Sequence, residues 1–129
     1  MAENKKMAHP RLAITNVCVE WNEQVSIPDF LSSVQSELRK YGVSSRVYSP
    51  GTVPAGCDAT LNYTAARDWD RHLLREQLIP YMTSASLTLY RDDKVLSQAN
   101  YQMKGVGFDK WASTSTKLAP LVESLLYDY

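Results

Sequence analysis

The sequence predicts an α/β (α+β) protein with a mixed sheet of about five strands, two main helices and one short inserted helix. Three patterns support this fold class: short alternating apolar segments, two apolar stripes at helical spacing, and a polar turn of hairpin length. The chain of 129 residues suits one domain, because domains typically hold ~100–200 residues. We expect residues 1–10 to form a flexible tail and residues 11–129 to form a single domain.

The first half of the chain predicts a strand–helix–strand unit followed by a third strand. Residues 12–19 are rich in β-branched and apolar residues and predict a buried strand. Ser26 is a typical helix N-cap and Gly42 a typical stop signal, so a helix is expected over residues 27–41. Its apolar stripe consists of Ile27, Leu31, Val34, Leu38 and Tyr41. Strands over residues 45–49 and 57–65 follow, and the strand–helix–strand order favours a parallel pair.

The second half predicts a short helix, a hairpin and a long helix. Leu73, Leu74, Leu78 and Ile79 have the spacing of about two helical turns between Asp68 and Pro80. Residues 85–90 and 95–103 flank the polar turn 91–94, as in a β-hairpin. A helix is expected over residues 114–127, with Pro120 acceptable only near its first turn unless the helix kinks. Its apolar stripe consists of Leu118, Leu121, Val122, Leu125 and Leu126.

The charge balance excludes several classes of function. Fourteen basic residues balance fourteen acidic ones, so the formal net charge is zero. A nucleic-acid-binding domain usually carries a concentrated basic face, and attachment to an anionic membrane needs a similar excess. No segment reaches the ~20 apolar residues of a membrane span. The polar start of the chain fits either a cytoplasmic protein or one whose targeting segment has been replaced.

Cys18 and Cys57 are the only cysteines, and the residues alone leave two interpretations open. Both can be buried free thiols that behave as small apolar side chains. Their predicted positions at the ends of strands would also allow a disulfide, which would stabilise the fold by roughly 3–4 kcal/mol in the chain-entropy model.

Several segments together resemble one bacterial family. They are Val17–Glu20, Leu38–Val43, Gly56–Ala65, Trp69–Asp70, Ala85–Tyr90 and Lys110–Val122. The chain resembles small uncharacterised proteobacterial lipoproteins over about residues 11–127. That resemblance implies export to the periplasm, tethering to the outer membrane through a lipid, and a Cys18–Cys57 disulfide, a bond that persists in such a compartment. Two departures stand out: the lipid-bearing cysteine and its leader are missing, and the stretch Arg71–Ile79 is longer than the family's short turn.

No residue pattern predicts a catalytic, metal or cofactor site. Asp68, Asp70 and His72 form the densest polar cluster, but a metal needs further converging ligands and the only other histidine is His9 in the tail. His72 is the sole plausible base for a nucleophile, and no nucleophile elbow accompanies it. We therefore expect no catalytic residue, no metal and no cofactor.

The sequence favours a non-enzymatic envelope protein that binds another envelope protein, as an assembly accessory or an immunity-type factor. Its aromatic residues near loops support a binding surface, because aromatic side chains are enriched at interfaces. The expected surface consists of Asp68, Trp69, Asp70, His72 and Trp111. We expect no nucleic-acid partner and a membrane contact only through a lipid anchor absent from this sequence. A periplasmic small-molecule-binding protein is the alternative, and a hydrolase that uses His72 is a third.

Overall fold

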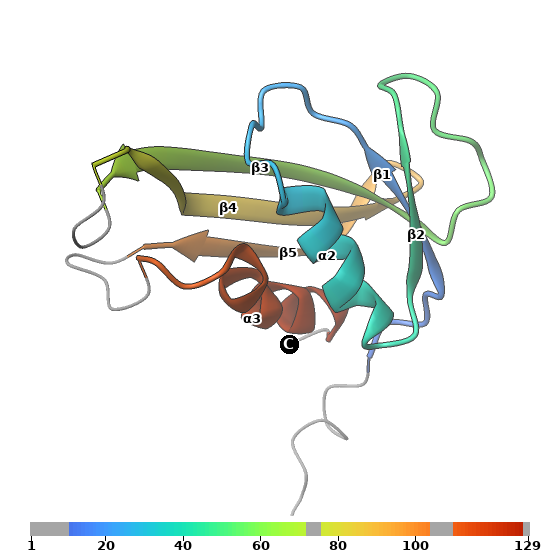
Figure 1. The fold of residues 1–129 in the computed structure, drawn as a ribbon. Helices are drawn as coiled ribbons and strands as arrows, with labels where there is room; N and C mark the ends of the chain where they lie inside the picture. Colours follow the sequence, from blue (N-terminus) through green and yellow to red (C-terminus); the bar gives the residue numbers. More distant parts are fainter. Residues whose placement is uncertain (1–10, 72–75, 104–109, 128–129) are drawn as a thin grey trace, which may run out of the picture.

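The computed structural model describes residues 11–71, 76–103 and 110–127. The described elements form a five-stranded mixed sheet and two helices (Figure 1), which confirms the predicted fold class. They are β1 (Asn16–Glu20), α2 (Phe30–Arg39), β2 (Ser44–Tyr48), β3 (Ala59–Asp70), β4 (Ile79–Arg91), β5 (Lys94–Gln102) and α3 (Thr114–Leu126).

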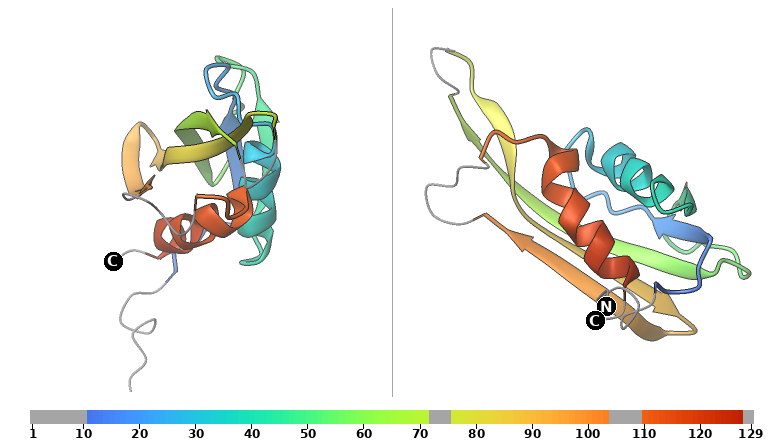
Figure 2. Two further views of the ribbon diagram at one scale, coloured as in Figure 1. Left: turned by 60° about the vertical axis from the view of Figure 1, so that its left-hand side comes forward. Right: turned by 90° about the horizontal axis from the view of Figure 1, so that it is seen from below.

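The sheet has the strand order β2-β1-β3-β4-β5. Strand β1 pairs in parallel with both β2 and β3, whereas β3–β4 and β4–β5 are antiparallel. The predicted parallel pair around the first helix is therefore confirmed. Both helices lie against the same face of the sheet (Figure 2), because each strand turns its apolar side chains to that face and each helix turns its apolar stripe back.

The core lies between the sheet and the two helices. Alternate residues of the central strands are buried there, including Leu61 of β3 and both Leu87 and Leu89 of β4, each with 0% exposure. Leu118, Leu121, Val122, Leu125 and Leu126 of α3 complete the core, which confirms that predicted stripe. No helix among the described residues is long and apolar enough to cross a membrane.

The first two elements begin later than predicted, for identifiable reasons. β1 starts at Asn16 because the Asp58 carboxylate accepts the N–H groups of Thr15 and Asn16, which fixes the chain before the strand. Helix α2 starts at Phe30, after the Asp29 cap, so Ser26 is not the N-cap. The Phe30 N–H donates to the Ile27 carbonyl at 3.0 Å, which forms a turn, and not to the Ser26 carbonyl as a helix that begins after Ser26 would require.

The end of α2 agrees with its predicted stop. Gly42 has a φ of +76°, a conformation that glycine adopts without steric cost. The Val43 N–H donates to the Leu38 carbonyl at 3.1 Å and the Gly42 N–H donates to Arg39 at 2.9 Å. These bonds satisfy carbonyls that the helix end would otherwise leave unpaired.

The predicted short helix before the hairpin is wrong at both of its ends. Trp69 and Asp70 belong to β3, and Ile79 belongs to β4. The two strands pair up to Asp70 and Ile79, so the antiparallel ladder takes the place of helical turns. Leu73 and Leu74, which suggested the helix, lie outside the described residues.

The predicted bounds of β5 and of the last helix agree with the structure to within one residue, whereas β4 begins at Ile79, six residues before the predicted start of the hairpin. Asp92 and Asp93 have φ values of 52° and 65° and form the tight turn between β4 and β5, the conformation that a two-residue hairpin turn requires. Pro120 lies inside α3, beyond its first turn. Because proline has no backbone N–H, the helix lacks one hydrogen-bond donor at that position.

Candidate binding surface at the distal end of the hairpin

The long β3–β4 hairpin extends beyond the rest of the sheet (Figures 1 and 2). Its register shifts at Ala66/Arg67, where Thr83 is the extra residue of a β-bulge. A bulge bends the strand and increases its twist. The residues beyond it, from Arg67 to Asp70 on β3 and from Ile79 to Met82 on β4, form a distal segment that faces the starts of α2 and α3.

An ion pair joins this segment to the chain just before α3. The Lys110 ammonium lies 2.5 Å from Asp70 Oδ2, and Asp70 Oδ1 accepts the Arg71 N–H at 2.7 Å. The hydrogen bond from Lys110 is the main reason why the pKa of the Asp70 carboxyl is lowered, and the Arg71 N–H adds to it. The same bond raises the pKa of Lys110. Both groups are therefore charged at neutral pH.

Two aromatic rings lie against the same ammonium group. Lys110 Nζ is 4.8 Å from the Tyr81 ring centroid and 5.5 Å from the Trp111 centroid. The two rings meet edge to face, with their centroids 5.4 Å apart. A cation over an aromatic face gains electrostatic attraction from the ring, so Lys110 is held by a carboxylate and by two rings together.

A buried lysine of helix α3 holds the segment with Lys110 and Trp111 in place. Lys117 of α3 is only 4% exposed. Its ammonium donates to the carbonyls of Met82 at 3.0 Å and of Lys110 at 2.9 Å. These bonds tie the first turn of α3 both to β4 and to the segment that carries Lys110 and Trp111.

Two large apolar side chains remain exposed at the same end of the molecule. Trp69 is 46% exposed, with the Arg67 guanidinium 4.7 Å from its ring centroid, and Leu78 is 55% exposed. Neighbouring exposed apolar side chains with a polar rim mark protein interaction sites, whereas single ones are ordinary. We call this the distal surface; it consists of Trp69, Asp70, Leu78, Tyr81, Lys110 and Trp111.

A cavity of about 340 Å³ opens between the distal segment and the starts of the two helices. Thr114 Oγ1 donates to Asp29 Oδ1 at 2.9 Å, so the first residues of both helices meet at its wall. This volume falls at the lower end of the range for small-molecule sites, ~300–1,000 Å³. Its walls include Ile27, Pro28, Asp29, Arg67, Tyr81, Met82, Lys110 and Trp111.

The structure brings together part of the surface expected from the sequence. Asp70 reaches Lys110, the neighbour of Trp111, whereas Asp68 only accepts the N–H of Trp69 at 2.8 Å. His72 lies outside the described residues. Lys110, Lys117 and Arg67 were missed as site residues, because their partners lie far away in sequence and no local pattern marks them.

The described residues do not assemble a metal site, since no group of three or more His, Cys, Asp or Glu side chains converges among residues 11–71, 76–103 and 110–127. His9 and His72 both lie outside these ranges. The Asp70 carboxylate, which belongs to the same predicted polar cluster as His72, accepts a hydrogen bond from Lys110.

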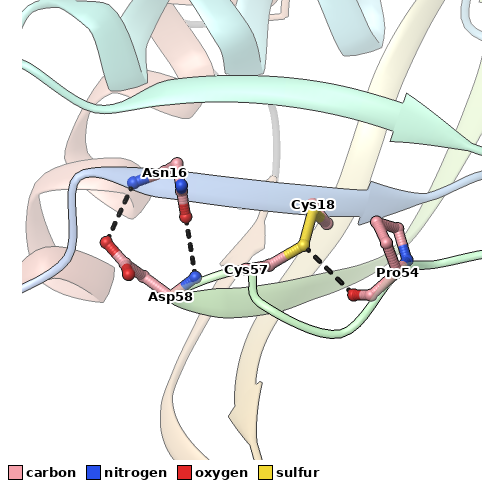
Figure 3. The surroundings of a disulfide bond; sticks show 5 residues. All are labelled: Asn16, Cys18, Pro54, Cys57 and Asp58. Carbon is pink, nitrogen blue, oxygen red and sulfur yellow. Dashed lines mark hydrogen bonds between the residues drawn. A yellow bond between two sulfur atoms is a disulfide. The ribbon is translucent and has the colours of Figure 1, made fainter.

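Cys18 and Cys57 form a disulfide (Figure 3). Their Cα atoms are 5.9 Å apart, which lies within the usual range for this bond. Cys57 Sγ also lies 3.4 Å from the Pro54 carbonyl oxygen. This is a close contact and not a hydrogen bond, because a sulfur in a disulfide has no hydrogen to donate. The disulfide joins β1 to the segment that leads into β3, on the sheet face opposite the helices.

The fold has a counterpart among solved structures, although the chain matches no protein-family model and no curated protein. It is similar to the PelC dodecamer of Paraburkholderia phytofirmans, with a TM-score of 0.52 and 18% sequence identity. The match covers 92% of this chain and 90% of the PelC chain. At this identity the likeness extends to the fold alone.

Proposed function

We propose that this chain is a non-enzymatic protein of the bacterial envelope that binds another envelope protein through the distal surface. The observation that carries the proposal is the exposure of Trp69 and Leu78 beside the ordered Asp70–Lys110 pair. Tryptophan is enriched among the residues that dominate binding energy, and the Arg67 guanidinium already lies against the Trp69 ring, so less ordering is needed when a partner covers it. The charged pair would lie at the rim and would orient the partner.

The disulfide supports a location in the periplasm. Such bonds persist in the periplasm and are rare in the bacterial cytosol. The resemblance to small proteobacterial lipoproteins agrees with this location, and a lipid anchor to the outer membrane belongs to the same proposal. PelC, which has a similar fold, is a dodecamer, so one protein of this fold does form protein–protein interfaces, which agrees with a protein as partner.

Pull-down from a solubilised envelope fraction of the source cell tests the proposal with matched tryptophan variants. Trp69→Ala removes the proposed anchor, and Trp21→Ala is the control, because Trp21 is 45% exposed but lies directly after β1, outside the distal surface. We expect one envelope protein to be retained by the wild type and by Trp21→Ala and to be lost with Trp69→Ala. Equal retention by both variants, with unchanged circular dichroism, would exclude the distal surface.

A second candidate function, small-molecule binding, is favoured by the cavity of about 340 Å³. Native mass spectrometry of protein isolated from the periplasm measures any bound molecule directly. An added mass that disappears in Arg67→Met but persists in the exposed control Arg46→Met would place the ligand in this cavity. Protein that carries no added mass would leave the distal surface as the better candidate.

A further inference from the structure

Strand β5 is an open edge of the sheet. Within residues 11–71, 76–103 and 110–127 it pairs with β4 on one side and with no strand on the other. Helix α3 covers one face of β5, and none of the described helices or strands lies along its outer edge (Figure 2). Between Lys94 and Lys104 the sequence contains no charged residue and no proline. Edge strands usually carry such residues, because they prevent pairing with another chain.

The ladder with β4 shows which backbone groups face outward. The Met103 N–H donates to the Thr83 carbonyl at 2.9 Å, so this pair is one of the hydrogen-bonded pairs. Hydrogen-bonded and non-hydrogen-bonded pairs alternate in an antiparallel ladder. The N–H and C=O groups of Gln98, Asn100 and Gln102 therefore point away from β4. Their side chains are exposed on the sheet face opposite the helices.

The other edge of the sheet is protected. Strand β2 has only five residues and carries Arg46 at its centre. The Gln35 amide donates to the Ser45 carbonyl at 3.3 Å, which occupies one backbone acceptor of this strand. A short strand and a charged side chain are the usual means of blocking strand addition. The two edges therefore differ, and only β5 is suited to receive another strand.

We propose that β5 is a dimerisation strand and that its occupant is β5 of a second copy of this chain, paired antiparallel about a two-fold axis at Asn100. In this register Asn100 faces Asn100 of the other copy and Gln98 faces Gln102. A primary amide both donates and accepts hydrogen bonds, so this row of amides is complementary to itself. The formal net charge of zero adds no overall repulsion between two copies. The two sheets join into one, with an isologous interface.

Light scattering coupled to size-exclusion chromatography, over a range of micromolar concentrations, measures the assembly. We expect the full chain to reach the mass of two copies. Asn100→Lys should raise the dissociation constant of the dimer by about tenfold, because two like charges then meet at the axis and the amide hydrogen bonds are lost. Asn62→Lys is the matched control, since Asn62 is exposed on an inner strand of the same sheet, and it should leave the dimer intact.

A cysteine at the axis tests the register. Directly opposed residues of a hydrogen-bonded antiparallel pair have Cα atoms about 5.5 Å apart, which a disulfide can bridge. Asn100→Cys should therefore yield a cross-linked dimer on non-reducing gels, and Asn62→Cys should not. A wild type that stays monomeric at every concentration overturns the proposal. A dimer that Asn100→Lys does not weaken, or that Asn100→Cys does not cross-link, assigns the interface to another surface and also overturns it.

Discussion

Asn16 of β1 and Asp58, the residue before β3, are joined by two reciprocal hydrogen bonds, which we call the clasp. Asp58 Oδ2 accepts the Asn16 N–H at 3.2 Å, and Asn16 Oδ1 accepts the Asp58 N–H at 2.7 Å (Figure 3). Asp58 Oδ2 also accepts the N–H of Thr15 at 2.7 Å and its hydroxyl at 3.0 Å. This clasp and the neighbouring disulfide both hold β1 against β3, so the join between the two strands rests on a carboxylate and on a covalent bond.

The clasp predicts acid sensitivity. The Thr15 N–H is the main cause of the lowered pKa of Asp58, followed by the Asn16 N–H. A carboxyl whose pKa is lower in the folded state stabilises the fold above its unfolded pKa of about 3.9, and that stability is lost as the pH falls through the folded pKa. Asp58→Asn should therefore flatten the acid limb of the curve of urea midpoint against pH.

Asp92→Asn is the matched control for this experiment, because it removes a carboxylate from the exposed β4–β5 turn and leaves the clasp intact. Its acid limb should follow that of the wild type. If Asp58→Asn kept the full acid dependence, the carboxylate would not be the group that responds to protons.

The Asp70–Lys110 pair predicts a second titration. Lys110→Met removes the hydrogen bond that chiefly lowers the pKa of Asp70, so the midpoint of Asp70 in a carbon-detected NMR titration should rise toward the ordinary value for aspartate. Lys94→Met, at the exposed start of β5, is the control and should not move it. Overall stability should change little, since water screens an exposed ion pair. An unmoved Asp70 midpoint in Lys110→Met would mean that the pair does not form in solution.

The disulfide closes a loop with a sequence separation of 39. The chain-entropy model predicts that its loss destabilises the fold by about 4 kcal/mol. The double variant Cys18→Ser/Cys57→Ser should show this loss in urea unfolding, and the wild type should show a similar loss when reduced. Alkylation should label the two thiols of the wild type only after reduction. Thiols that label freely in the denatured, unreduced protein would contradict the bond and weaken the case for the envelope.

Sequence reasoning placed the elements whose burial follows a simple period. Leu87 and Leu89 are alternate residues of β4, and the leucines of α3 repeat at helical spacing. The spacing of apolar residues therefore predicted both elements, and these leucines are buried in the structure. The outer part of β3 carries no such signal, because every residue from Arg67 to Asp70 is exposed. Leu78 and Ile79 then matched a helical spacing by coincidence, and the ladder with β3 overrode it.

The residues of the distal surface were likewise predictable only where the sequence itself carries a signal. The sequence marks Asp70 by the polar cluster that it forms with Asp68 and His72, and marks Trp69 and Trp111 as aromatic residues near loops. The pairing of Asp70 with Lys110 spans 40 residues, and the charges of a surface pair leave no periodic trace in sequence. Arg67 was hidden for a related reason, since its guanidinium lies between a backbone carbonyl before α2 and the ring of Trp69.

Two leucines of the β4 region separate stability from binding. Leu87 is fully buried in the core, so Leu87→Ala should destabilise the fold by ~2–5 kcal/mol through lost apolar burial and the cavity left behind. Leu78 is 55% exposed, and Leu78→Ala should stay within about 0.5 kcal/mol of the wild type. Urea midpoints measure both. A Leu78→Ala variant that is as stable as the wild type yet loses the envelope partner would attribute the loss to the distal surface, whereas a strongly destabilised one would show that Leu78 packs in the fold and is no free anchor.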